Sequence, residues 1–292
     1  MTKKVGILGP LLTWTHAAAL KGYDKWNEIV PIDGIDNVIA AVEAGKVDEG
    51  VVPEENKISG EIAATYAGIY QRDVTVIDKI GLPIRNCLAV LPTGLSVDRI
   101  NRFITKPEAY AQTGVWRSKH MPAVSLVPWD STAGGMMEIR DKNLRDAAGL
   151  GPEIAADHYN LAVLARDIDD VADNATLFSV ITGGRKVKTQ PEQGKTYETW
   201  LLMMPLQNVP GELYRMLTPI YKHGLDMTKI SSIEHLPMYL PGGYLFEIRI
   251  KGHAAEPRVK SALSALEKQC AKEATKLVIA GSYPLVRLSD VR

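Results

Sequence analysis

The chain has 292 residues, 46% hydrophobic and 23% charged, which suits two or three compact units with cores of their own. Its 34 acidic and 34 basic side chains balance to zero, so nothing indicates a polyanionic partner such as nucleic acid. The only cysteines, Cys87 and Cys270, lie far apart in no metal-binding spacing, and no apolar run reaches membrane-spanning length. A small-molecule partner and a reducing cytoplasm fit this composition.

Strands and helices are predicted to alternate through the first two thirds of the chain. A short strand at 5–8 ends in Gly-Pro and precedes an Ala-rich helix at 15–23. A helix that ends at Gly45 leads to a buried strand at 49–52, which we expect Pro53 to stop. A helix over 59–73, strands over 74–80 and 85–92, and further alternation lead to a strand at 176–181. This order predicts α/β layers with the functional loops at strand ends.

The last third of the chain has a different order. Segment 183–196 is rich in Gly, Lys and Gln without apolar periodicity, which predicts a linker between domains at 1–182 and 197–292. From 197 onward the pattern reads strand, helix, strand, strand, helix, strand, the βαββαβ order of a ferredoxin-like unit.

Five sequence elements, in chain order, carry a resemblance to a known family. They are the following segments, each with the family pattern that it resembles: Gly9–Ala19 (GPxGTFSHxAA), Asp48–Lys57 (D.GVVPIENS), Pro107–Gln112 (Pro-x-Ala-x-x-Gln), Ser131–Thr132 (a Ser-Thr pair) and Pro152–Ile181 (AA..Y.L.vL...IqD...N.TRF.vI). With these elements, the chain is similar to prephenate dehydratases with a C-terminal ACT domain. The resemblance implies two α/β lobes of the periplasmic-binding-protein type with the substrate between them, followed by the ACT domain.

The resemblance also implies a prephenate site without a cofactor or metal. The leaving hydroxyl of prephenate needs a hydrogen-bond donor, and its two carboxylates need donors or a cation. We expect catalytic roles for Thr176, Asn56 and Glu55. Substrate contacts are expected from Thr13, Thr15, His16, Lys57, Ser131, Thr132 and Phe178. Ordinary structural roles stay open, with the threonines and the serine as helix caps and the histidine as a packing residue.

Three departures from the family pattern bear on the chemistry. Leu177 replaces the arginine of Thr-Arg-Phe, Lys57 replaces the serine of Glu-Asn-Ser, and Leu12-Thr13-Trp14 replaces Gly-Thr-Phe. Because leucine cannot supply the donors of a guanidinium, we hypothesise that positive charge has moved from position 177 to Lys57.

The same departures leave three functions open. Related prephenate decarboxylases also lack the arginine, so the sequence slightly favours decarboxylation without aromatisation. The alternatives are dehydration to phenylpyruvate in aromatic amino acid biosynthesis, which the retained Thr176 favours, and a catalytically silent ligand sensor or partner protein.

The C-terminal domain carries a possible effector site. The resemblance implies that an amino acid binds there, at Pro210, Gly211, Glu212, Leu213, Glu234 and His235. A homodimer or homotetramer in the cytoplasm is expected by resemblance, with no nucleic-acid or membrane partner.

Overall fold

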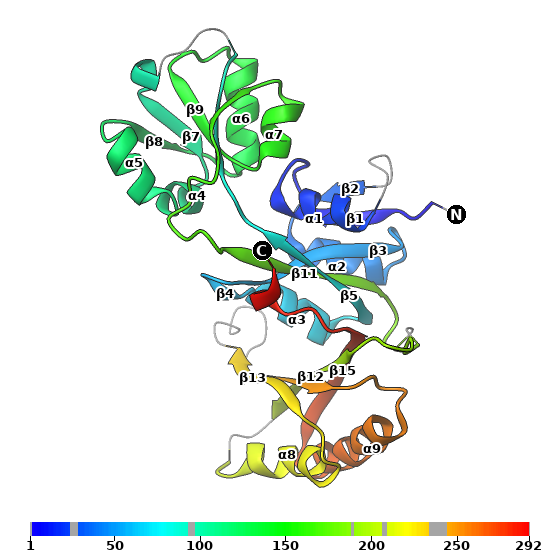
Figure 1. Ribbon diagram of the computed structural model, residues 1–292. Helices are drawn as coiled ribbons and strands as arrows, with labels where there is room; N and C mark the ends of the chain where they lie inside the picture. Colours follow the sequence, from blue (N-terminus) through cyan, green and yellow to red (C-terminus); the bar gives the residue numbers. More distant parts are fainter. Residues whose placement is uncertain are drawn as a thin grey trace.

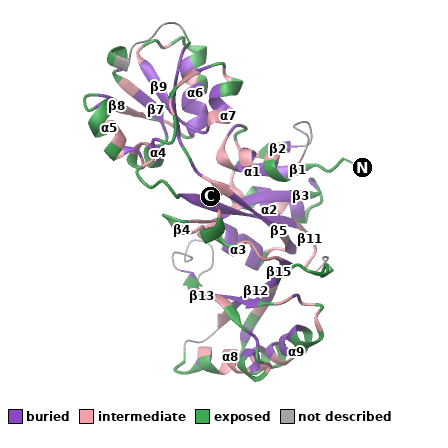
Figure 2. Ribbon diagram, in the orientation of Figure 1, coloured by how far each residue is buried: buried purple, intermediate pink, exposed green. Residues whose placement is uncertain are grey.

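Two α/β lobes and a third unit make up the computed structural model (Figure 1). It describes residues 2–23, 29–92, 97–187, 190–205, 209–233 and 244–291. Buried residues concentrate on the strands, while the outward faces of the helices are exposed (Figure 2).

The first lobe is built on a mixed sheet in the order β5-β11-β3-β1-β2. β1 runs parallel to β2 and β3, whereas β11 is antiparallel to both β3 and β5. The strands are β1 (Val5–Leu8), β2 (Ile29–Ile32), β3 (Glu49–Asn56), β5 (Val74–Pro83) and β11 (Ala175–Gly183), with the short β4 (Gly60–Glu61) paired to β3. The helices are α1 (Trp14–Gly22), α2 (Ile35–Glu43) and α3 (Ala63–Gln71).

The second lobe is a five-stranded sheet in the order β10-β6-β9-β7-β8. Its strands are β6 (Cys87–Val90), β7 (Arg102–Thr105), β8 (Ser125–Pro128), β9 (Ala147–Gly151) and β10 (Ala162–Ala165). Its helices are α4 (Pro107–Ala111), α5 (Gly114–His120), α6 (Thr132–Asp141) and α7 (Glu153–His158), with a 3-10 turn at Val97–Arg99.

Two chain segments, 84–86 and 166–174, connect the lobes and bond to each other. The backbone N–H of Ile84 donates to Asn174 O at 2.9 Å, and the side-chain amide of Asn86 donates to Asp169 Oδ1 at 2.5 Å. These two segments form the hinge between the lobes.

The third unit confirms the predicted βαββαβ order, with its strands arranged as β13-β14-β12-β15. Its elements are β12 (Tyr197–Pro205), α8 (Glu212–Lys222), β13 (Met227–Ile233), β14 (Leu245–Lys251), α9 (Pro257–Lys272) and β15 (Thr275–Pro284). A 3-10 turn at Leu288–Asp290 follows β15 and contacts β11. The predicted linker 183–196 spans the interval from the end of β11 to the start of β12, and the domain boundaries stay a prediction.

One close contact joins the third unit to the first lobe in a continuous sheet. β15 pairs with β5 through Gly281 and Val76. A β-carbon at Gly281 would lie 2.0 Å from Val76 O, so only glycine allows the two backbones this approach.

Two predicted element boundaries are wrong. β3 does not stop at Pro53 but continues to Asn56. The pairing of β3 with β11 shifts register between Leu177 and Phe178, which leaves Glu54 without a partner residue on β11, and proline is tolerated in a strand next to such a bulge. The helix predicted from residue 59 begins at Ala63, because Gly60–Glu61 pair with the end of β3 as β4.

Candidate active site

The predicted site residues of the first lobe meet at one edge of its sheet. β1 and β3 are parallel and end at this edge, and the antiparallel β11 begins there. Loop residues after β1, Asn56 at the end of β3 and Thr176 near the start of β11 therefore share the edge that faces the second lobe (Figure 1). The carboxyl ends of parallel strands are where α/β proteins bind ligands.

Asn56 and Thr176 form a directed pair on this edge. The side-chain oxygen of Asn56 accepts from the backbone N–H of Ile58 at 2.9 Å and of Ser59 at 3.0 Å, which fixes the orientation of its amide. The amide nitrogen then donates to Thr176 Oγ1 at 2.9 Å. Because the Thr176 hydroxyl accepts this bond, its hydrogen can be donated elsewhere, and no acceptor for it lies within the described parts of the chain.

Asn174 belongs to the same group, although the sequence analysis assigned it no role. Its side-chain oxygen accepts from Asn56 Nδ2 at 3.0 Å. Its own amide nitrogen is buried and has no hydrogen-bond partner among the described atoms. An unsatisfied buried donor costs free energy, so a bound substrate or a water would stabilise it. The available signal was its position two residues before Thr176, within the matched sequence element.

The loop after β1 is ordered by its own side chains. Thr13 Oγ1 donates to Pro10 O at 3.0 Å, and Thr15 and His16 are buried. His16 Nδ1 accepts from the backbone N–H of Leu12 at 2.8 Å. Burial, and next the neighbouring His158 of α7, lower the pKa of His16, which favours the neutral ring that can accept this bond. His16 thus orders the loop, and the substrate contact predicted for it stays a prediction.

Ser131 and Thr132 lie across from this loop, in the second lobe. Ser131 is the N-cap of α6, and its hydroxyl accepts from the N–H of Gly134 at 2.9 Å, so the capping role left open for it is present. Thr132, the first residue of α6, is buried. Ala133 of the same helix shares a buried apolar cluster with Leu12, which brings the start of α6 close to the first lobe's loop.

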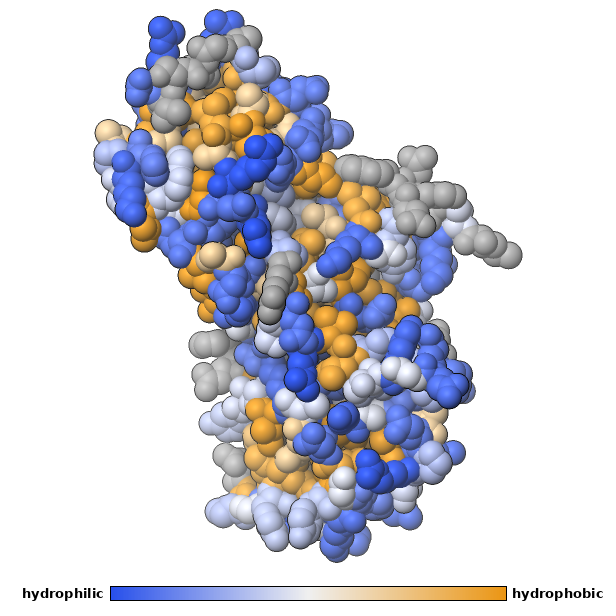
Figure 3. All heavy atoms as spheres, in the orientation of Figure 1, coloured by the Kyte–Doolittle hydropathy of each residue, from blue (hydrophilic) through white to orange (hydrophobic). Residues whose placement is uncertain are grey.

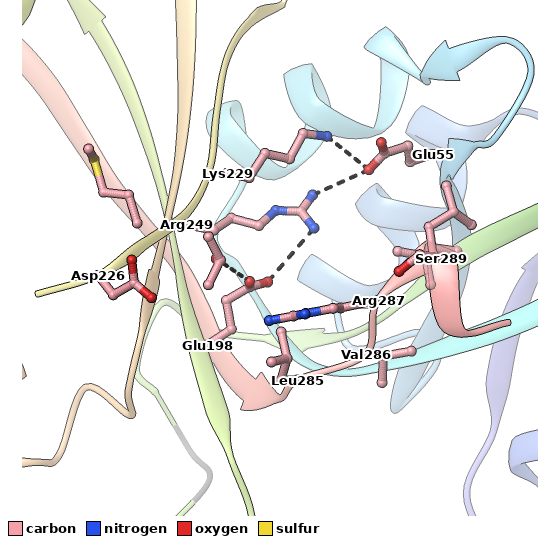
Figure 4. A pocket seen from close by; sticks show the side chains of 13 residues that line it. Glu55, Glu198, Asp226, Lys229, Arg249, Leu285, Val286, Arg287 and Ser289 are labelled. Atoms are coloured by element: carbon pink, nitrogen blue, oxygen red, sulfur yellow. Dashed lines mark hydrogen bonds and ion pairs between the residues drawn. The ribbon is translucent and has the colours of Figure 1, made fainter.

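Two other predicted site residues, Phe178 and Glu55, lie outside this group: Phe178 is packed in the core, and Glu55, like Leu177 opposite it, lies on the other face of the sheet. Phe178 is 1% exposed and lies in an apolar cluster with residues of β1 and α1, so it is a core residue. Leu177 and Glu55 point the other way, into the wall of a cavity of about 490 Å³ between the first lobe and the third unit. In Figure 4, Lys229 and Arg249 reach toward Glu55 from β13 and β14. Glu55 Oε2 lies 2.8 Å from Lys229 Nζ, an ion pair that joins the first lobe to the third unit, and its catalytic role stays a prediction.

Lys57 does not take the place of a guanidinium at position 177. Its ammonium group forms an ion pair with the exposed Asp173. It lines a separate cavity of about 400 Å³, together with Arg85, Asn174 and Ser289. Positions 57 and 177 face different cavities, so Lys57 does not occupy the place of a side chain at position 177, and its contact with the substrate stays a prediction.

A buried ion cluster lies behind the cavity wall that contains Leu177. The described charged residues of this cluster are Glu54, Lys79, Glu198, Glu247 and Arg249. Glu54 Oε1 lies 2.6 Å from both Lys79 Nζ and Arg249 Nη2, and Arg249 Nη2 lies 2.5 Å from Glu247 Oε1. Burial raises the pKa of Glu54, but Lys79 and Arg249 outweigh it and bring the pKa to about 2. The cluster joins strands of the first lobe to strands of the third unit, which is a structural role.

Four of the predicted effector residues fall in one turn of the third unit. Gly211 precedes α8 and has a φ of +80°, a left-handed conformation that favours glycine. Pro210 is exposed, Leu213 packs partly against the core, and the buried Glu212 accepts from Thr275 Oγ1 at 3.4 Å. The other two, Glu234 and His235, lie outside the described residues.

The described residues contain no group of three or more His, Cys, Asp or Glu side chains placed to hold a metal ion. Within the same residues, no helix has both the length and the apolar character needed to cross a bilayer.

Comparison with known proteins places these features in a family. The family model described as prephenate dehydratase matches residues 5–186. The bifunctional chorismate mutase/prephenate dehydratase of Aquifex aeolicus is 34% identical over 98% of this chain and 75% of its own length. The arogenate dehydratase/prephenate dehydratase 2 of Arabidopsis thaliana is 30% identical over 97% of this chain and 73% of its own. A solved prephenate dehydratase from Arthrobacter aurescens, in complex with L-Phe, is 28% identical with a TM-score of 0.82, covering 97% of this chain and 92% of that one.

Proposed function

Because this chain belongs to the prephenate dehydratase family, we propose that it is a lyase that converts prephenate to phenylpyruvate, CO2 and water. The observation that carries the proposal is the Asn56–Thr176 pair, which leaves a hydroxyl hydrogen available on the edge between the lobes. The dehydratase names of the relatives from Aquifex aeolicus and Arabidopsis thaliana support the same reaction.

In the proposed mechanism the bond from the ring to its carboxylate breaks, and the electron pair moves through the diene. The carbon–oxygen bond on the opposite side of the ring then breaks, and one proton joins the leaving hydroxide to form water. Thr176 donates a hydrogen bond to that leaving oxygen, and Asn56 orients the hydroxyl through its 2.9 Å bond. Since threonine stays neutral near pH 7, its role is to position the leaving group and stabilise its developing charge.

Dehydration now has more support than the decarboxylation that the sequence slightly favoured. That preference depended on Leu177 facing the substrate in place of an arginine. Leu177 instead lines the cavity beside the third unit, on the strand face opposite to Thr176. The replacement of the family's arginine by Leu177 therefore does not show that the substrate has lost a cationic partner at the edge that carries Thr176.

Product analysis tests the proposal. Purified protein is incubated with prephenate and, separately, with arogenate, a substrate in the name of the Arabidopsis thaliana relative, and the products are identified by NMR. Phenylpyruvate from prephenate is expected, and Thr176→Val is the control that should lose it. A non-aromatic dihydro-hydroxyphenylpyruvate would instead show decarboxylation, and unchanged substrate would favour a silent sensor.

For the third unit, we propose an ACT-type domain at 197–292 that binds an amino acid and associates with a second copy of the chain. The βαββαβ order and the L-Phe complex of the Arthrobacter aurescens enzyme support this proposal. Apolar side chains on the sheet edge and on α8 are exposed, with Ile230 at 46% and Tyr221 at 84%. Light scattering of Ile230→Lys should show a loss of dimer, and calorimetry with L-Phe tests the effector. A cytoplasmic location remains part of the proposal.

A further inference from the structure

Leu12 adopts a backbone conformation that ordinarily favours glycine. It lies in the loop between β1 and α1, with φ of +68°. A residue with a β-carbon is strained in this left-handed region, so it is expected there only where surrounding contacts hold it. The family pattern that the sequence resembles has glycine at this place, so the leucine is a feature of this chain.

The side chain of Leu12 is buried in the other lobe. It is 2% exposed and belongs to an apolar cluster whose other buried members include Cys87, Ala133, Met136 and Ala155. Among the described residues, every other buried member of that cluster lies between Cys87 and Leu161, in the second lobe. We call the packing of Leu12 against these residues of the second lobe the Leu12 contact.

The loop that carries Leu12 is itself held in place. The N–H of Leu12 donates to His16 Nδ1 at 2.8 Å, and His16 is fully buried at the start of α1. The neighbouring Leu11 does not enter the second lobe in this way, because it is 38% exposed. It lines a cavity of about 550 Å³ with Pro10, Ile32 and Tyr159. In Figure 3 apolar side chains continue across the junction of the lobes in this region.

The Leu12 contact lies away from the hinge. In the sheet order β5-β11-β3-β1, the hinge follows β5 and precedes β11, whereas Leu12 follows β1. Two strand spacings separate β1 from β11 and three separate it from β5, which is roughly 10 Å and 14 Å. A contact at this distance from the hinge resists opening of the lobes, whereas hinge contacts allow rotation about themselves.

We propose that Leu12 is a positioning residue that holds the two lobes closed over the Asn56–Thr176 edge before any substrate binds. Its effect on turnover rests on the proposed function, but its effect on lobe closure does not. With the Leu12 contact in place, substrate binding need not supply the free energy of closure. Without it, part of the binding free energy is used to close the lobes, so the apparent affinity falls while the closed complex reacts as before.

Distance measurements test closure without any turnover. Spin labels are placed on cysteines at the exposed Lys46 of the first lobe and Arg145 of the second, since both native cysteines are buried. Without ligand, pulsed dipolar spectroscopy should show a single short distance between the two labels in the parent protein. In Leu12→Gly and Leu12→Ala the distance should be longer and its distribution broader. Leu12→Met, which keeps an apolar side chain of similar volume, should restore the short distance. Val30→Ala, which shortens an exposed apolar side chain on β2 of the same lobe, is the control and should leave it unchanged.

Kinetics on the same variants give the second readout. Leu12→Gly and Leu12→Ala should raise KM for prephenate about tenfold with kcat within twofold, and Leu12→Met and Val30→Ala should resemble the parent. Unchanged distances in Leu12→Gly and Leu12→Ala would overturn the proposal, as would a fall in kcat at constant KM. If the parent protein forms no phenylpyruvate, the proposed function fails, and the distances alone decide the role of Leu12.

Discussion

The first lobe makes two contacts of opposite chemical character. Away from the hinge it meets the second lobe through the apolar Leu12 contact, in a loop that the neutral ring of His16 orders. It meets the third unit through the buried ion cluster around Glu54 and Arg249, and through the backbone pairing of Gly281 with Val76. Separating apolar faces costs about 25 cal/mol per Å² exposed, whereas separating buried ion partners leaves uncompensated charge, at about 3–5 kcal/mol. The interface between the two lobes can therefore open, whereas the interface between the first lobe and the third unit stays closed.

The largest effect is expected where the ion cluster loses a cation. Arg249→Leu should lower the free energy of unfolding by about 3–5 kcal/mol, because two buried carboxylates, Glu54 and Glu247, lose this partner. Denaturant unfolding measures the loss. Arg72→Leu is the matched control, since Arg72 also pairs with two carboxylates, Asp36 and Glu43, but at the surface. Its removal should cost about 1 kcal/mol or less, and equal losses in the two variants would contradict the comparison.

A somewhat smaller effect is expected on the edge between the lobes, and on catalysis rather than on stability. Asn56→Ala should lower kcat for phenylpyruvate formation about 100-fold, because Thr176 loses the amide that orients its hydroxyl. Steady-state kinetics measures the change. Asn37→Ala provides the control, since it removes an exposed amide of the same lobe that donates to Asp33 O at 2.7 Å. Equal kcat values in the two variants would remove Asn56 from the site.

Acid should weaken the ion cluster in a defined pH range. The pKa of Glu54 is about 2 in the fold, well below the ordinary value of 4.5, so its contribution to stability is present above about pH 4.5 and is lost as the pH falls toward 2. Between pH 5 and pH 3 this one group should account for about 2 kcal/mol of lost unfolding free energy. Denaturant unfolding at both pH values should show a smaller drop for Glu54→Gln than for the parent, and parallel drops would contradict the assignment.

The smallest effect is expected at Lys57. Its ion pair with Asp173 is exposed, and the lysine faces a different cavity from Leu177. Lys57→Met should therefore change kcat/KM for prephenate by less than about twofold. A tenfold loss of kcat/KM would indicate that Lys57 contacts the substrate and would support the hypothesis that it replaces a missing guanidinium.

Elements with local signals were predictable from the sequence. Apolar periodicity and turn residues gave the α/β alternation and the βαββαβ order of 197–284, since both depend on residues close in the chain. Asn56 and Thr176 were expected to share a site, and their cross-strand pairing places them together.

Features that depend on distant partners were not predictable. The bulge at Glu54, next to Pro53, requires knowledge that β3 pairs with β11. The direction in which Glu55 and Leu177 face follows from that pairing and from the packing of the third unit, so the linear motif could not show that both line the cavity beside that unit. The burial of Leu12 depends on closure of the lobes, which no local pattern encodes.

We propose that the chemistry belongs to the face of β11 that presents Thr176 and not to the face that presents Leu177. The most direct measurement compares kcat/KM for phenylpyruvate formation in Thr176→Val and Leu177→Ala, with circular dichroism to show that both variants are folded. Loss of a single hydrogen-bond donor at Thr176 should lower kcat/KM by about 10²–10³, while Leu177→Ala should stay within about threefold of the parent. Full activity in Thr176→Val together with loss of activity in folded Leu177→Ala would contradict the account.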